Sequence, residues 1–201
     1  MEQSLKLANN FSLNDINFSG FSASESWAGY FEINKGFSFS LIEEAISLFE
    51  GFFKEKDEKI MVLTALSFDD RKEDDEETIR KYHSLYEQMK GKRLLLPMTE
   101  PYEDYLYGDS VLPADSLSIS FIKNDFVEMS KLMMCHAGVI GEVCFYINPL
   151  LNIAVYPHDD VGFGCIGLNS EKSSCQEFLH YCSKSKNFNV FINNGEGLIK
   201  I

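Results

Sequence analysis

Residues 142–168 read EVCFYINPLLNIAVYPHDDVGFGCIGL, and this stretch decides the fold. Three short runs rich in β-branched and aromatic residues lie at 142–148, 152–156 and 163–168. A Pro-Leu pair separates the first two runs, and the turn-like stretch 157–162 separates the last two. Such short connections join antiparallel strands, because a parallel crossover needs about a dozen residues or more. The stretch therefore predicts an antiparallel meander.

The elements predicted around this meander mix strands and helices. Further strands are predicted from apolar or alternating runs at 60–68, 116–122 and 187–192. A first helix is predicted to begin at Ser40, whose spacing from Glu43 matches a capping box. Other helices are predicted from apolar residues at helical spacing over 77–90, 126–135 and 170–182. This order predicts an α+β fold, a single domain with a mostly antiparallel sheet and three to four helices.

The N-terminal residues differ in composition from the rest of the chain. The length of 201 residues suits one domain with a substantial core. Residues 1–29 are rich in Ser, Asn and Phe, with no helical period. They carry more aromatic residues than a disordered tail would. We therefore expect residues 1–29 to form an arm packed on the body, and residues 30–201 to form the α+β domain.

The chain carries a large excess of acidic residues. Asp and Glu number 31 against 18 Lys and Arg, which gives a net charge of −13. Nucleic acids and anionic membranes require a cationic protein surface, so general binding to either is excluded. The charge favours a basic protein as the partner.

Cysteine usage and the N-terminus predict a cytoplasmic protein. The cysteines are odd in number and gathered in the last third of the chain, unlike a secreted disulfide framework. They are Cys135, Cys144, Cys165, Cys175 and Cys182. Residues 1–6 show no basic segment followed by an apolar one, so we expect no signal peptide. No apolar run approaches the length of a membrane span.

Motifs for cofactors, metals and nucleophilic catalysis are weak. Gly162, Gly164 and Gly167 give G-x-G-x-x-G, but the residues between them favour a strand, whereas a nucleotide fingerprint leads into a helix. A twisted or bulged strand is the preferred interpretation. The cysteines and histidines lack the spacing of zinc ligands, and no nucleophile elbow is present. We therefore expect no cofactor, no metal and no enzymatic activity.

Most of the net charge is concentrated in two short windows. The first, 69–77 (DDRKEDDEE), contributes −5, and the second, 99–109 (TEPYEDYLYGD), contributes −4. The dipole of the helix that follows explains acids in the first window, which also offer carboxylates to a partner. The candidate contacts in this window are Asp69, Asp70, Asp74 and Asp75.

The second window interleaves acids with tyrosines. Its Pro and Gly predict a loop. Tyrosine is enriched at protein interfaces, and carboxylates pair with Arg and Lys. This window is therefore the stronger candidate for a binding surface. Its candidate contacts are Glu100, Tyr102, Glu103, Asp104, Tyr105, Tyr107 and Asp109.

The turn before the last run of the meander carries His158, Asp159 and Asp160. Two carboxylates beside an imidazole can perform acid–base catalysis, whereas Asp in a turn commonly bonds to the backbone. Three interpretations stay open. We favour a structural turn over a partner-binding loop, and a partner-binding loop over a catalytic group.

Four short motifs occur in order along the chain: EI at 32–33, LFEGFF at 48–53, DEKI at 57–60 and VYPHDDVG at 155–162. Together they resemble an uncharacterised bacterial domain family whose signature turn reads Tyr-Asp-Asp-Arg-Gly. This chain has His158 in place of the tyrosine and Val161 in place of the arginine. Such families often occur as small proteins in polymorphic toxin neighbourhoods, so the resemblance implies an immunity protein.

The leading hypothesis is a bacterial immunity protein that binds and neutralises a cognate toxin domain. A cationic nuclease of a contact-dependent or polymorphic toxin system would suit the charge. Acidic, tyrosine-bearing loops would then cover the basic substrate surface of the toxin. Two alternatives stay open: a small cytoplasmic enzyme that uses His158, Asp159 and Asp160, and an adaptor domain for a basic host protein.

Overall fold

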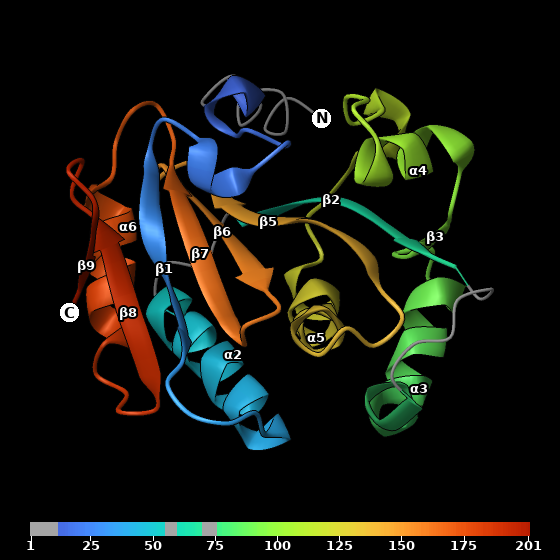
Figure 1. Ribbon diagram of the computed structural model, residues 1–201, viewed down its shortest axis with the longest axis horizontal. Coiled ribbons are helices and arrows are strands. Elements are labelled where there is room, and N and C mark those ends of the chain that lie inside the picture. Colours follow the sequence, from blue (N-terminus) through green and yellow to red (C-terminus); the bar gives the residue numbers. More distant parts are fainter. Residues whose placement is uncertain (1–11, 55–59, 70–75) are drawn as a thin grey trace.

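A single nine-stranded sheet organises the protein (Figure 1). The computed structural model describes residues 12–54, 60–69 and 76–201. The strand order is β3-β2-β5-β6-β7-β1-β8-β9, with β4 paired to β2, and β2–β3 is the parallel pair. The strands are β1 (Trp27–Ile33), β2 (Met61–Phe68), β3 (Leu96–Pro97), β4 (Ser118–Ser120), β5 (Ile140–Asn148), β6 (Ile153–His158), β7 (Gly162–Gly167), β8 (Phe188–Asn193) and β9 (Leu198–Lys200).

Helices connect the strands and confirm the predicted α+β fold. The meander is present as β5, β6 and β7. Five α-helices are described instead of three to four, because the second acidic window forms a helix. None of these five is long and apolar enough to cross a bilayer. They are α2 (Phe39–Phe53), α3 (Glu76–Gly91), α4 (Glu100–Tyr107), α5 (Lys123–Met134) and α6 (Ser173–Cys182).

The two faces of the sheet are covered unequally. Helices α2, α3, α5 and α6 pack on the face that carries Tyr146, Val155 and Phe163, which we call the helix face. The larger core lies there, with Phe49 of α2 stacked on Phe163 at a centroid distance of 5.1 Å. The opposite face, which carries Phe145, Tyr156 and Ile166, supports a smaller core and is called the arm face.

The arm face is covered by the N-terminal segment and by α4 (Figure 1). The ring of Phe21 packs against Phe145 and Tyr156, at centroid distances of 4.8 and 4.9 Å. The indole nitrogen of Trp27 donates to the Tyr156 hydroxyl at 2.9 Å. Of the expected arm, residues 1–11 lie outside the described residues, residues 12–26 lie on this face, and residues 27–29 already belong to β1.

The glycine cluster lies in β7, in the middle of the sheet, as the strand interpretation requires. A Cβ atom at Gly162 would lie 1.8 Å from the Phe31 carbonyl oxygen, and one at Gly164 would lie 2.3 Å from Cζ of Tyr156. A Cβ at Gly167 would lie 2.0 Å from the Glu171 carbonyl oxygen. Close packing within the sheet at Gly162 and Gly164, and against the connection to α6 at Gly167, therefore explains these glycines, and no phosphate cradle is needed.

Three local predictions were wrong. Helix α2 begins at Phe39, and Ser38 is its N-cap. The Ser38 hydroxyl makes no capping hydrogen bond to the helix backbone and instead forms a hydrogen bond with the Ser40 hydroxyl at 2.9 Å. The helix predicted over 126–135 begins three residues earlier, because residues 123–125 form the first turn of α5. The strand predicted at 116–122 is reduced to β4, whose side chains are largely exposed because it pairs at the edge with β2.

We expect Gly162→Ala to lower the free energy of unfolding by about 1–3 kcal/mol, because the added methyl group collides with the β1 backbone. Gly36→Ala is the matched control, since nothing lies within 4 Å of a Cβ at that position. Urea unfolding of both variants measures the difference. Equal midpoints for Gly162→Ala and the unchanged protein would contradict the packing explanation.

Candidate functional site

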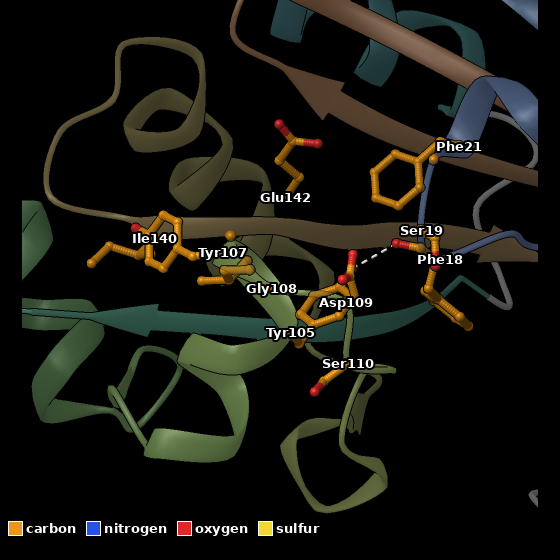
Figure 2. A pocket seen from close by; sticks show the side chains of 13 residues that line it. Phe18, Ser19, Phe21, Tyr105, Tyr107, Gly108, Asp109, Ser110, Ile140 and Glu142 are labelled. Carbon is orange, nitrogen blue, oxygen red and sulfur yellow. Dashed lines mark hydrogen bonds between the residues drawn. The ribbon is translucent and has the colours of Figure 1, made fainter.

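A groove of about 600 Å³ runs between the arm and α4 on the arm face. Figure 2 shows Phe18 and Phe21 of the arm on the side of Asp109, Tyr107 on the opposite side beside Ile140, and Glu142 of β5 above them. The Tyr105 hydroxyl donates to the Phe18 carbonyl oxygen at 2.6 Å and so joins the two walls. Burial and the Glu142 carboxylate raise the pKa of Tyr105, which keeps this phenol a neutral donor.

Glu142 reaches the groove because of an irregularity in β5. Val143 pairs with Ala65 and Ile140 pairs with Ser67, so β5 contains one residue more than β2 over this interval. Such a bulge redirects side chains. Gly141 within it has φ +93°, and a Cβ there would lie 2.1 Å from the Tyr102 hydroxyl oxygen. Only glycine fits both requirements.

A cleft of about 350 Å³ continues from the groove, where β5 and β6 separate. The β5–β6 ladder joins 146–148 to 153–155, whereas β6 remains paired with β7 as far as His158. Pro157 lies in the separated part and has no N–H to donate to a neighbouring strand. Side chains of the cleft include Phe21, Tyr107, His136, Glu142, Tyr156, His158 and Asp159.

His158 occupies the end of β6 and is partly buried. Its Nε2 lies 3.0 Å from the Phe31 carbonyl oxygen, which can only accept, so this nitrogen carries the proton. Burial lowers the pKa of His158, although Asp160, the bond to Phe31 and Asp159 act to raise it. The imidazole is therefore neutral at pH 7, with its Nδ1 lone pair free of a proton.

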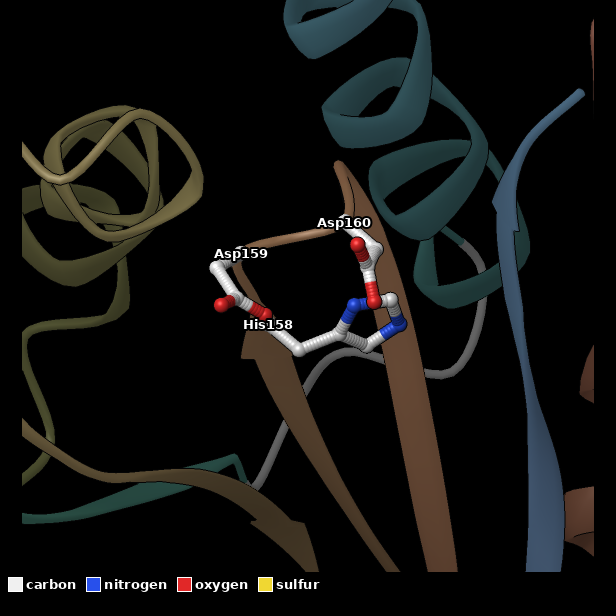
Figure 3. A group of neighbouring side chains, drawn as sticks. All are labelled: His158, Asp159 and Asp160. Carbon is white, nitrogen blue, oxygen red and sulfur yellow. The ribbon is translucent and has the colours of Figure 1, made fainter. Parts of the chain in front are cut away.

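The neighbouring carboxylates make this end of the sheet strongly acidic. Asp159 pairs with His136 at 3.3 Å between Oδ2 and Nε2. Burial and Asp160 raise the pKa of Glu32, and Lys200 lowers it. Figure 3 shows the His158 ring beside the Asp160 carboxylate at the β6–β7 turn.

His158, Asp159 and Asp160 are also the residues that could hold a metal ion. One potential ligand atom from each lies within 4.8 Å of the other two. Two of the three are exposed carboxylates in a turn, an arrangement that is common without an ion. Their proximity alone therefore does not assign a metal centre.

The structure separates the residues of the second window into two groups. Helix α4 replaces the predicted loop, because Pro101 is tolerated in its first turn, where Glu100 and Glu103 also face the positive end of the helix dipole. Tyr102 is only 1% exposed and donates to the Ala65 carbonyl oxygen at 2.5 Å, so its side chain lies in the core and not on the surface of the window. Tyr107 is 63% exposed. Exposed acids of this window are Glu100, Glu103, Asp104 and Asp109.

The first window contributes little that can be placed. Asp69 follows β2 and is only 8% exposed, so little of its side chain is accessible to a partner. Asp70, Asp74 and Asp75 lie outside the described residues. The groove and cleft therefore bring together the second window and the His158 turn, without a contribution from Asp69.

Sequence reasoning missed several residues of the site. Glu142 was placed in a strand, and its neighbour Gly141 was the available signal, because glycine inside a strand often marks a bulge. Phe18 and Phe21 lie within the predicted arm, but the groove that they line depends on α4. His136 gave no sequence signal, because its pairing with Asp159 joins the end of α5 to a distant turn.

Comparison of the chain with family models, curated proteins and solved structures finds no match. The resemblance to the family with the Tyr-Asp-Asp-Arg-Gly turn thus stays a prediction.

Tyr102→Phe should lower the free energy of unfolding by about 0.5–1.5 kcal/mol, because it removes a buried hydrogen bond. Tyr107→Phe, five residues further along the same helix, should change the free energy of unfolding by less than about 0.5 kcal/mol. Urea unfolding of the two variants measures the difference in stability between them. Equal losses of unfolding free energy in both variants would show that the Tyr102 hydroxyl does not stabilise the fold more than the Tyr107 hydroxyl does.

The pKa of His158 should lie below its ordinary value, and Asp160→Asn should lower it further by removing a neighbouring negative charge. In the unfolded chain His158 has its ordinary pKa of about 6.5, so the unfolded chain binds the proton more readily than the folded protein does. The contribution of His158 to stability is therefore lost as pH falls from about 6.5 towards the folded pKa. NMR titration of the imidazole resonances measures both values. A higher pKa in Asp160→Asn would contradict the electrostatic assignment.

Proposed function

We propose that the protein binds a basic protein partner through the groove, the cleft and the exposed acids of α4. The observation that carries this proposal is the meeting of three acidic residues from distant parts of the sequence. Asp109 follows α4, Asp159 follows β6, and Glu142 of β5 lines both cavities. Among the described residues that line these cavities, none is Lys or Arg.

The side chains of this surface suit protein recognition. Tyr105 and Tyr107 offer rigid contact area, which is favourable because tyrosine loses little conformational freedom on binding. The carboxylates attract a cationic partner over distances near the Debye length, about 8–10 Å at physiological salt. Charge steers the encounter, and the aromatic side chains then provide the buried area.

Immunity to a toxin is the biological role that we propose for this binding. The resemblance to a family from toxin neighbourhoods supports a cognate toxin domain as the partner, and the acidic surface supports a basic one, such as a nuclease. In this mechanism the groove and α4 cover the cationic substrate surface of the toxin. An adaptor for a basic host protein would use the same surface and differs only in the partner.

A non-enzymatic role agrees better with the local bonding around His158 than acid–base catalysis does. One ring nitrogen of His158 is committed to the main chain of β1. The enzyme alternative is favoured only by the proximity of His158, Asp159 and Asp160.

The product of the adjacent upstream reading frame should co-purify with this protein. Neutralising Glu103, Asp104 and Asp109 together should weaken that complex about 10- to 100-fold, as expected from roughly 0.5–1 kcal/mol for each charge. Raising the ionic strength should slow association. Binding measured by calorimetry and by stopped-flow fluorescence checks both effects.

The matched control neutralises three exposed acids away from the groove, Glu50, Glu87 and Glu196. It removes the same net charge and should leave affinity nearly unchanged. Equal weakening in the two triple variants would show that only net charge matters. Failure of any neighbouring product to bind would overturn the proposed immunity role.

A further inference from the structure

The cleft is smaller than the groove, and this difference points to a separate task. Its volume of about 350 Å³ is at the lower end of the range for ligand sites, about 300–1,000 Å³. It therefore suits a single side chain better than a nucleotide or a folded segment. Its position at the separation of β5 and β6 gives it a wall from each strand.

The charges of the cleft select a cation. Glu142 lies on the β5 wall and Asp159 lies after the end of β6. Within the part of the chain that the structure describes, Glu142 makes no ion pair and no hydrogen bond. Asp159 is paired with His136, but both side chains are more than half exposed, so solvent screens this pair and an incoming cation can compete for it.

Aromatic rings supply the remaining recognition surface. Phe21, Tyr107 and Tyr156 all line the cleft. The Tyr156 ring is held by the Trp27 bond and by its contact with Phe21, so it needs no ordering on binding. A guanidinium group stacks on aromatic rings and pairs with carboxylates through its planar fork, whereas an ammonium group offers only a point charge.

We propose that the cleft receives one arginine side chain of the partner, with its guanidinium between Glu142 and Asp159 and against the aromatic rings. This inference rests on the proposed binding function and specifies the anchor of the same surface. A buried arginine is a frequent centre of binding energy in protein interfaces. The groove then contributes steering and contact area around this anchor.

Three blocked tripeptides test the inference: Ac-Gly-Arg-Gly-NH2, the corresponding lysine peptide and the corresponding citrulline peptide. Citrulline keeps the shape of arginine but carries no charge. Titration followed by amide NMR should give a dissociation constant on the order of 1 mM for the arginine peptide. The lysine peptide should bind several-fold more weakly and the citrulline peptide at least tenfold more weakly. Shifts should be centred on Tyr107, Glu142 and His158.

Glu142→Gln should weaken the arginine peptide at least fivefold, whereas Glu196→Gln, in the loop before β9, should not. Equal binding of arginine and citrulline, or no binding, would overturn the inference. Equal binding of lysine would overturn the choice of arginine. If Glu142→Gln leaves a co-purified partner fully bound, the anchor is wrong and the binding function stands. If the peptide binds but no neighbouring product does, the immunity role fails alone.

Discussion

The Tyr156 side chain extends across β7 to β1, and the geometry of the arm face depends on this crossing. It is possible because Gly164 has no side chain, so the phenol ring lies where a Cβ would be 2.3 Å from its Cζ. The ring is thereby brought within hydrogen-bond distance of the Trp27 indole at 2.9 Å. Phe21 then packs on Tyr156, and this contact holds the arm against the sheet.

The unequal coverage of the two faces explains where a site can form. Four helices seal the helix face, where thiols such as Cys144 and Cys182 are buried and have raised pKa values. Among the described residues, the arm face is covered by the arm, by α4 and by the segment after α4 that carries Leu112 and Leu117, and the bond from Tyr105 to Phe18 joins the arm to α4. The space between them is the groove. The end of the β5–β6 ladder near Pro157 then opens the cleft beside it.

The tertiary structure decides which of the concentrated acidic side chains face the groove and the cleft. Helix α4 turns Tyr102 into the core and leaves its acids outside, since residues four apart on a helix share one face. The bulge at Gly141 adds Glu142, and the turn after β6 adds Asp159. Like charges are thus gathered without a lysine or arginine among the described residues that line the cavities. A bound cation would relieve their mutual repulsion.

The sequence by itself determined the fold class, the meander, strand β2 and the apolar faces of helices such as α6. These follow from periodicity, because burial on one face imposes a repeat that can be counted along the chain. It also identified the acidic window around Tyr107 and the turn at His158. Helix α4 was missed because Pro and Gly signal a loop in isolation, whereas Pro is compatible with a first turn and Gly108 only follows the helix.

Only the tertiary structure decided which side chains share the site. The burial of Tyr102 and Asp69, the direction of Glu142 and the pairing of His136 with Asp159 all depend on contacts between distant segments. A bulge shifts the alternation of a strand by one residue, and strand separation depends on both neighbours at once. A local sequence pattern does not reveal a bulge or a strand separation, because both are properties of how two strands pair and not of one segment.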